Sequence, residues 1–107
     1  MIATIKQNDT KPIFKDSSPS IDGVPLTPAD VVGCTLKFLM KNADGSVAVS
    51  QVATINPDAT FSYQPILADV STPGQYRQEW QMTYSNGKTI TFPNNDYNTV
   101  NILPDLG

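Results

Sequence analysis

Apolar and polar residues alternate along most of the chain, and residues that favour turns interrupt the alternation. A period of two is typical of strands with one buried face, because successive side chains point to opposite sides of a sheet. The runs are short, and turns recur every 8–12 residues or so, which is typical of a β-sandwich. The expected strands are Ile2 to Gln7, Ile13 to Lys15, Cys34 to Lys41, Ser46 to Ile55, Phe61 to Tyr63, Gln75 to Ser85, Lys88 to Phe92 and Tyr97 to Leu103.

The two longest runs each have one predominantly apolar face. We expect these faces to line the core, while the opposite faces, which are mostly charged or polar, meet solvent. In the first run the inward positions are Cys34, Leu36, Phe38 and Met40. In the second run they are Tyr76, Gln78, Trp80, Met82 and Tyr84.

Hairpin turns are expected after both of these runs. Asp44-Gly45 and Asn86-Gly87 are dipeptides that favour tight turns between antiparallel strands, and each is flanked by alternating residues. The first turn leads into a return strand in which Val47 and Val49 are expected to share one face. Ile90 and Phe92 are expected to point inward from the strand after the second turn.

The remaining connections are rich in proline and polar residues. Asp16 to Pro28 is expected to form a polar loop with a tight turn at Asp22-Gly23, and Leu26 is expected to fill the core beneath it. Pro12 predicts a kinked edge strand, because proline cannot donate to a strand ladder. Pro65 to Thr72 is the one stretch where a helical turn is expected.

Two details favour an immunoglobulin-like sandwich. Gly74 and Tyr76 begin the longest strand in a Gly-x-Tyr pattern, and in immunoglobulin-type domains the hydroxyl of such a tyrosine bonds to upstream backbone. Gln78 stands where antibody domains have a cysteine, and Cys34 lies on an earlier inward-facing run, at the position expected for the other half of that disulfide. The predicted fold is therefore all-β: an immunoglobulin-like antiparallel β-sandwich of about seven or eight strands, without a disulfide, in a single domain over residues 1–107.

Composition argues against several classes of function. The chain of 107 residues has 7 basic and 10 acidic side chains, a net charge of -3, no histidine and one cysteine. Histidine-dependent catalysis, imidazole metal sites, cysteine zinc sites and redox pairs are therefore excluded. The weakly acidic balance does not suit nucleic acid, and the short apolar runs do not suit a membrane span. We expect a non-enzymatic protein without cofactor or metal, made in the cytoplasm because no signal peptide is recognisable.

Several polar residues have the chemistry of catalytic or metal-binding groups, but ordinary roles are expected for each. Loop acids are usually solvated, so Asp9, Asp16 and Asp22 are not expected to form an acid–base pair. Glu79 lacks the second carboxylate that a glycosidase requires, because it is the single glutamate of the chain. Calcium ligation was considered for Asn42 with Asp44 and for Asn94-Asn95-Asp96, but such residues are typical of turns.

The aromatic residues could form a sugar-binding platform, and the cysteine could be a nucleophile. An aromatic platform for sugar would need exposed rings, and the candidates are Trp80, Tyr63, Tyr84 and Tyr97. Trp80, Tyr76 and Tyr84 share a face with Met82, which favours a place in the core, whereas Tyr97 follows a polar loop. Cys34 has no neighbouring base to activate it, so a structural thiol is expected.

The order of these turns and strands resembles one known family, the N-terminal domain of bacteriophage baseplate upper proteins. The resemblance extends from Ile5 to about Ile102, and the order and spacing of the motifs carry it. Asn8 stands where that family often has glycine. The matching segments are Ile5 to Thr10, Leu26-Thr27, Val32 to Phe38, Pro73 to Tyr76, Asn86 to Lys88 and Thr91 to Pro93.

The resemblance implies a structural component of a bacteriophage virion that docks onto other tail or baseplate proteins, in several copies around a symmetry axis. Members of the family usually continue into a linker and further domains, so capsid decoration and a place in the neck are alternatives. A carbohydrate-binding module for host adhesion is a third possibility. The expected contact regions, chosen by position, are Ile2 to Asp9, Asp16 to Pro28 and Asn94 to Tyr97.

Overall fold

The computed structural model describes residues 2–9, 13–93 and 98–104. Within these ranges the chain forms strands and short 3-10 helices, and none of those helices is long and apolar enough to cross a membrane. In chain order the elements are β1 (Ile2–Lys6), β2 (Phe14–Asp16), β3 (Ser20–Ile21), β4 (Val24–Pro25), η1 (Pro28–Val31), β5 (Thr35–Lys41), β6 (Val47–Val52), β7 (Thr54–Ile55), β8 (Phe61–Tyr63), η2 (Leu67–Val70), β9 (Gly74–Thr83), β10 (Thr89–Phe92) and β11 (Asn98–Leu103).

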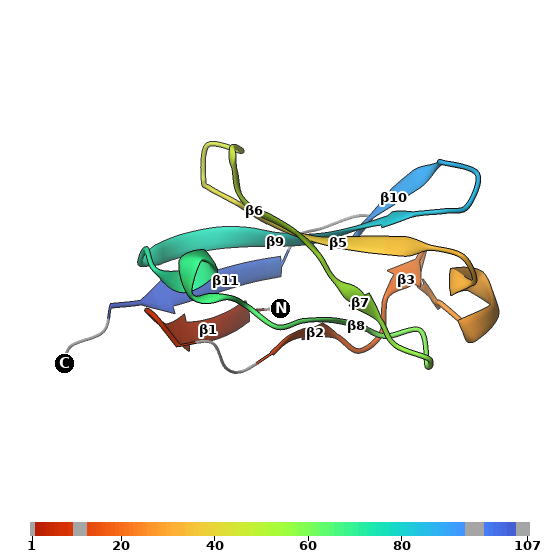
Figure 1. Cartoon of the computed structure of the whole chain (residues 1–107), viewed down its shortest axis with the longest axis horizontal. Helices are drawn as coiled ribbons and strands as arrows, with labels where there is room; N and C mark the ends of the chain where they lie inside the picture. Colours follow the sequence, from red (N-terminus) through yellow and green to blue (C-terminus); the bar gives the residue numbers. More distant parts are fainter. Residues whose placement is uncertain (1, 10–12, 94–97, 105–107) are drawn as a thin grey trace.

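The strands form a large sheet, a small sheet and a separate hairpin (Figure 1). The large sheet has the order β1-β11-β9-β5-β6, and β10 also pairs with β9. The small sheet has the order β2-β8-β7 and packs on the inner face of the large one, while β3 pairs with β4. The predicted all-β sandwich without a disulfide is confirmed.

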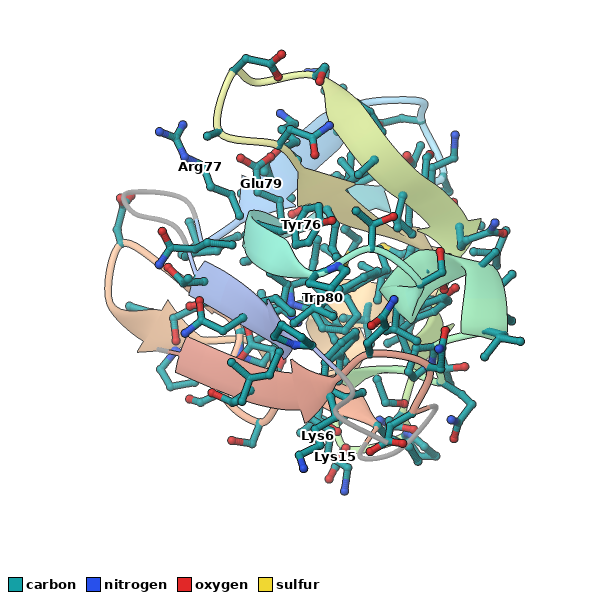
Figure 2. All side chains as sticks on the ribbon, turned by 90° about the vertical axis from the view of Figure 1, so that its left-hand side faces the viewer. Lys6, Lys15, Tyr76, Arg77, Glu79 and Trp80 are labelled. Atoms are coloured by element: carbon teal, nitrogen blue, oxygen red, sulfur yellow. The ribbon has the colours of Figure 1, made fainter. Side chains whose placement is uncertain are left out.

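Strand β9 is the centre of the large sheet, because its ten residues are long enough for three partners. Its first half pairs with β11, its second half pairs with β10 on the same side, and β5 runs along the other side. The predicted alternation is confirmed: Trp80 lies in the interior, whereas Arg77 and Glu79 lie on the outer face (Figure 2).

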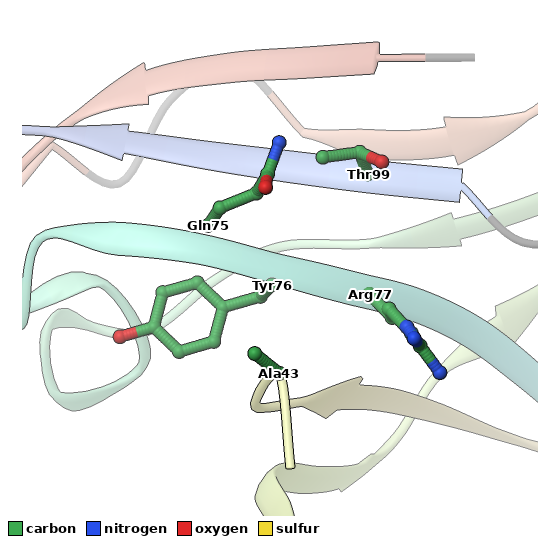
Figure 3. Close-up of a pocket in the computed structure, with 5 residues that line it drawn as sticks. All are labelled: Ala43, Gln75, Tyr76, Arg77 and Thr99. Carbon is green, nitrogen blue, oxygen red and sulfur yellow. The ribbon is translucent and has the colours of Figure 1, made fainter. Parts of the chain in front are cut away.

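The predicted tyrosine corner is present at the start of β9. The Tyr76 hydroxyl donates a hydrogen bond of 2.8 Å to the backbone oxygen of Thr72, four residues upstream. Gly74 has a φ of +152°, which a residue with a side chain rarely adopts. Figure 3 shows Tyr76 and Gln75 on opposite sides of β9. This interaction is a hallmark of immunoglobulin-like sandwiches and confirms that part of the fold prediction.

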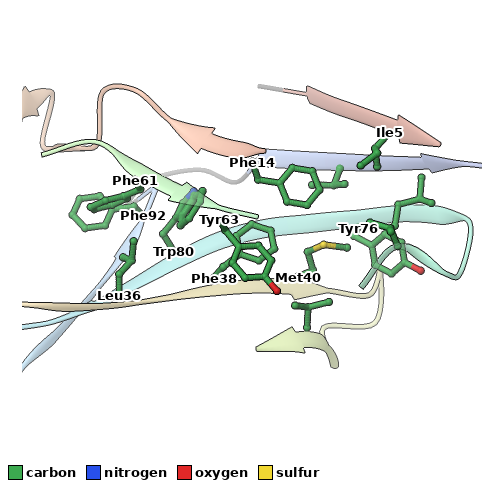
Figure 4. Close-up of a cluster of buried hydrophobic side chains, with 14 of the residues drawn as sticks. Ile5, Phe14, Leu36, Phe38, Met40, Phe61, Tyr63, Tyr76, Trp80 and Phe92 are labelled. Carbon is green, nitrogen blue, oxygen red and sulfur yellow. The ribbon is translucent and has the colours of Figure 1, made fainter. Parts of the chain in front are cut away.

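Stacked aromatic rings join the two sheets (Figure 4). Phe38 of the large sheet packs between Phe14 and Tyr63 of the small sheet, with ring centroids 5.2 and 4.6 Å apart. Trp80 meets the edge of Phe38 at 5.0 Å, and Phe61 lies 5.8 Å from Trp80. Trp80 is fully buried, and its Nε1 has no hydrogen-bond acceptor within the described ranges. Packing therefore positions this ring.

The expectation that Cys34 stands at the position of the second half-cystine is wrong. Gln78 is buried opposite Met40, because β5 and β9 are adjacent strands of the same sheet. Cys34 precedes β5 by one residue and therefore lies six residues from the position that faces Gln78. An inter-sheet disulfide needs one cysteine on each sheet, so Cys34 does not occupy the other half-cystine position.

At β6, an edge strand of the large sheet, the structure differs from the prediction that Val47 and Val49 share one face. Val49 is buried opposite Met40, but the pairing shifts by one residue and places Val47 opposite Lys41. Such a β-bulge sets two residues against one and changes the face that they occupy. Val47 is 55% exposed, whereas Val49 is 6% exposed, so the two valines do not share a face.

The described residues contain more strands than the seven or eight expected, for two reasons. The loop Asp16 to Pro28 contains the hairpin β3–β4, whose turn residues Asp22 and Gly23 both have positive φ. The run Ser46 to Ile55 divides into β6 and β7, because its end leaves the large sheet and joins the small one. Leu26 is half-buried against the core, as expected.

Two further differences concern pairing and helices. β1 pairs with β11 in parallel, with five residues in register from Ile2 opposite Thr99 to Lys6 opposite Leu103, whereas an antiparallel sandwich was expected. The helical turn expected in Pro65 to Thr72 is confirmed as η2, but Pro28–Val31 forms a second short helix, η1. The kink expected at Pro12 lies outside the described residues.

Replacing Tyr76 with phenylalanine tests the tyrosine corner. The variant loses the bond to Thr72 but keeps the ring, so we expect a decrease of about 1 kcal/mol in the free energy of unfolding. Tyr84→Phe is the control, because the structure gives the Tyr84 hydroxyl no hydrogen bond within the described residues. Urea unfolding measures both. Equal loss of stability in the two variants would contradict the role of the corner.

Candidate protein interaction surfaces

Asp44, a candidate calcium ligand, holds a turn together instead, and Asp58 does the same in another turn. Asp44 accepts hydrogen bonds from the backbone N–H of Ser46 at 2.9 Å and from its hydroxyl at 2.6 Å, and these bonds lower the pKa of Asp44. Asp58 accepts the same pair of bonds from Thr60, at 3.2 and 2.6 Å, and its pKa is lowered for the same reason. Asn42 bonds to the Ser46 hydroxyl at 3.0 Å. This is ordinary turn chemistry.

The other candidate acids do not converge. Asp16 is half-buried at the end of β2, and desolvation raises its pKa, although the backbone N–H of Ser18 donates to it at 3.1 Å. Asp22 is exposed in the β3–β4 turn, and Asp9 is exposed after β1. Across residues 2–9, 13–93 and 98–104, no three acidic or cysteine side chains gather in a way that could hold a metal ion. Asn94-Asn95-Asp96 lies outside these residues.

Glu79 and Cys34 have structural surroundings. The Glu79 carboxylate lies 3.1 Å from the ammonium group of Lys41 across the β5–β9 ladder, and both side chains are partly exposed. The Cys34 sulfur lies 3.7 Å from the backbone oxygen of Asp30 and 3.9 Å from that of Val32. Desolvation raises the pKa of the thiol, which disfavours the nucleophilic thiolate.

The aromatic residues do not form an exposed row. Trp80 is fully buried, Tyr63 is 7% exposed and Tyr76 is 8% exposed. Tyr84 is half-buried against the core cluster. Tyr97 lies outside the described residues. The platform that a sugar ring would need is therefore absent from the part of the chain that the structure describes.

One hollow coincides with an expected contact region. It measures about 300 Å³ and lies between the β3–β4 hairpin and the end of β9, and we call it the hairpin hollow. Its lining is mostly apolar, and Val24 at its rim is 67% exposed. Its one carboxylate, Asp30, already accepts hydrogen bonds from the Thr27 backbone and hydroxyl at 2.8 and 3.0 Å. The lining residues are Ile21, Val24, Pro25, Leu26, Asp30 and Tyr84.

The opposite end of the molecule also exposes apolar residues, Ile66 and Leu67 at η2 and Leu103 at the end of β11, and we call this end the corner surface (Figure 1). These side chains are 51%, 58% and 44% exposed. Hydrogen bonds tie the end of β1 to both neighbours: the Gln7 N–H donates to the Leu103 oxygen at 2.7 Å, and the Asn8 N–H donates to the Val70 oxygen at 2.9 Å. The expected contact region Ile2 to Asp9 therefore adjoins this surface (Figure 1).

The position of η2 in the corner surface is fixed by a buried tyrosine. The Tyr63 hydroxyl donates to the Asp69 carboxylate at 2.5 Å, and the same carboxylate accepts the backbone N–H of Ile66 at 3.0 Å. Burial, this hydrogen bond and the negative charge of Asp69 together raise the pKa of Tyr63. The pair thereby connects the small sheet to the helix that presents Ile66 and Leu67.

A smaller polar groove lies beside the tyrosine corner. It measures about 170 Å³ and is lined by residues of the β5–β6 turn, β9 and β11, with Ala43 and Tyr76 on one side of β9 and Gln75 and Thr99 on the side of β11 (Figure 3). Its lining combines polar groups with the ring of Tyr76 and the methyl group of Ala43. The groove has no carboxylate, cysteine or histidine, so it offers neither a nucleophile nor the usual metal ligands.

Comparison with known proteins supports the fold but does not establish a family. No protein-family model matches the chain, and no curated protein matches it. A structural match is the crystal structure of CopC from Methylosinus trichosporium OB3b, with a TM-score of 0.52 and 10% sequence identity. The alignment covers 98% of this chain and 86% of that one. At this identity the match shows a shared fold alone, and the resemblance to baseplate upper proteins stays a prediction.

The Tyr63–Asp69 pair predicts a pH dependence of stability. The native state keeps Tyr63 protonated where the unfolded chain ionises, so this stabilisation is complete below the unfolded pKa of about 10 and is lost as the pH rises beyond it. We expect wild-type stability to fall more steeply than that of Tyr63→Phe between pH 9 and 11, roughly the range around that pKa. Urea unfolding at several pH values measures both slopes, and parallel slopes would contradict the prediction.

Proposed function

We propose that this protein is a non-enzymatic structural component of a bacteriophage virion, where it acts as a docking module in the tail or baseplate. Its partners are other virion proteins, and it is made in the host cytoplasm. The mechanism is surface complementarity: an unreactive sandwich holds apolar loops and strand edges in fixed positions for neighbouring subunits.

The hairpin hollow is the observation that carries the proposal. It is an apolar depression on the loop Asp16 to Pro28, beside exposed Val24, and its carboxylate is already occupied by local hydrogen bonds. A hollow of this kind suits an apolar side chain from a partner, because interfaces gain most from an anchor that fills a desolvated pocket. It does not suit catalysis, which needs groups that bind or transfer protons.

The proposed location in the tail or baseplate follows from the resemblance to baseplate upper proteins. The segments Pro73 to Tyr76 and Asn86 to Lys88 resemble that family in order and spacing. Capsid decoration or a place in the neck would use the same surfaces. Carbohydrate binding is less well supported, because Trp80 and Tyr63 are buried among other rings.

Particle composition tests the proposal directly. We expect mass spectrometry of purified particles of the source phage to detect this polypeptide among the structural proteins. We also expect Val24→Glu, introduced into the phage genome, to reduce its incorporation at least about tenfold, because a charge in an apolar anchor site costs most of the binding.

The control for this experiment is Thr89→Glu, an exposed substitution on β10: Thr89 lies opposite Thr83 on the outer face of the sheet, whereas Tyr84 of the hollow packs against the core on the inner face. Both variants should unfold at nearly the wild-type urea concentration, because exposed substitutions change stability by about 0.5 kcal/mol or less. Particles that lack the polypeptide would overturn the proposed function. Equal incorporation of the two variants would overturn the role of the hollow.

A further inference from the structure

Strand β6 forms one edge of the large sheet and carries no charged residue. The sequence from Ser46 to Asn56 contains neither charged residues nor proline. Proteins usually protect exposed edges with charges, proline or very short strands. The other edges of the two described sheets have this protection: β1 ends at Lys6, β2 contains Lys15 and Asp16, β7 has only two residues, and β10 lies between Lys88 and Pro93.

The hydrogen-bonding groups of β6 alternate between its two sides. The backbone N–H of Ala53 donates to the oxygen of Leu36 at 2.9 Å, and the register places Gln51 opposite Phe38 and Val49 opposite Met40. In an antiparallel ladder every second residue bonds to the same neighbour. The backbone groups of the intervening residues, Ser50 and Val52, therefore point away from β5, at the free edge.

The exposed side chains of β6 are also apolar. Val52 lies opposite Lys37 on the outer face of the sheet and is 79% exposed. Val47, displaced by the bulge, lies opposite Lys41 and is 55% exposed. The two valines stand at opposite ends of the strand, with Ser50 between them.

We propose that β6 pairs antiparallel with β6 of a second copy of this chain, about a two-fold axis at Ser50, so that two large sheets become one. The symmetry places Val52 of each copy beside the Val47-Ala48 end of the other, so exposed apolar side chains meet. A two-fold contact requires a surface complementary to itself, and an uncharged edge with apolar groups at both ends meets that requirement.

Electrostatics does not oppose pairing with a second copy. The lysines of β5 in the two copies would be separated by three strand spacings, about 14 Å. This distance exceeds the Debye length of about 8 Å at physiological ionic strength, so their repulsion is screened. Lys41 is also paired with Glu79 in its own chain. Self-pairing therefore brings no unscreened like charges together.

Sedimentation equilibrium of the full chain, from micromolar to millimolar concentration, tests the proposal. We expect a reversible dimer, and we expect Val52→Lys to weaken association about tenfold, because it places a charge on the paired edge of both copies. Val32→Lys is the matched control: Val32 is 77% exposed but follows η1, away from the β6 edge. Its association constant should equal that of the wild type.

Cross-linking tests the register independently. In a Cys34→Ser background, Ser50→Cys places two thiols at the proposed axis, and mild oxidation should give a covalent dimer at a concentration where Ser85→Cys gives little. Ser85 is also an exposed serine, and it lies at the β9–β10 turn.

Three outcomes would overturn the self-pairing: a wild-type monomer at millimolar concentration, equal weakening by Val52→Lys and Val32→Lys, or equal cross-linking through positions 50 and 85. If the protein is a monomer, the partner that pairs with the β6 edge would be a strand from another protein. The dimer does not depend on the proposed virion role, so absence of the polypeptide from particles would leave these measurements unaffected.

Discussion

Phe38 of β5 packs between Phe14 of β2 and Tyr63 of β8, so one ring of the large sheet contacts two strands of the small sheet. Antibody domains use a disulfide to join their sheets, and this chain has a single cysteine. Aromatic pairs contribute about 0.5–1.5 kcal/mol each beyond the burial of their area, so two such contacts approach the roughly 2–4 kcal/mol of a typical disulfide. The other features described here depend on this contact, because it holds the two sheets together.

Much of the fold could be predicted because single-strand patterns depend on local sequence. Alternation identified the inner faces of β5 and β9, and the Gly-x-Tyr pattern identified the corner made by Tyr76. Sheet membership could not be predicted in the same way. Cys34 does not occupy the expected position of the second half-cystine, because alternation reveals which face is buried but not which strands are neighbours. The parallel pairing of β1 with β11 likewise arises from an interaction between distant segments, whereas the shift at Val47 is a one-residue bulge within the β5–β6 hairpin.

The candidate surfaces were predictable only in outline. Turn chemistry correctly favoured a local role for Asp44. The loop Asp16 to Pro28 was chosen by position, but its hollow exists because a hairpin and a short helix fold against Tyr84. The edge formed by β6 carries a recognisable signal, an uncharged run from Ser46 to Asn56. Only the strand order shows that this run lies at an exposed edge; an uncharged strand in the middle of a sheet is common.

The parallel pairing of β1 with β11 has a mechanical consequence. Five residue pairs connect these strands in register, from Ile2 opposite Thr99 to Lys6 opposite Leu103. Tension applied at the start of β1 and the end of β11 acts along the strands and in opposite directions. The ladder is then loaded in shear, so its hydrogen bonds must yield together, whereas a hairpin pulled from its open end separates one bond at a time. The arrangement of these two strands makes the sandwich stiff along its long axis.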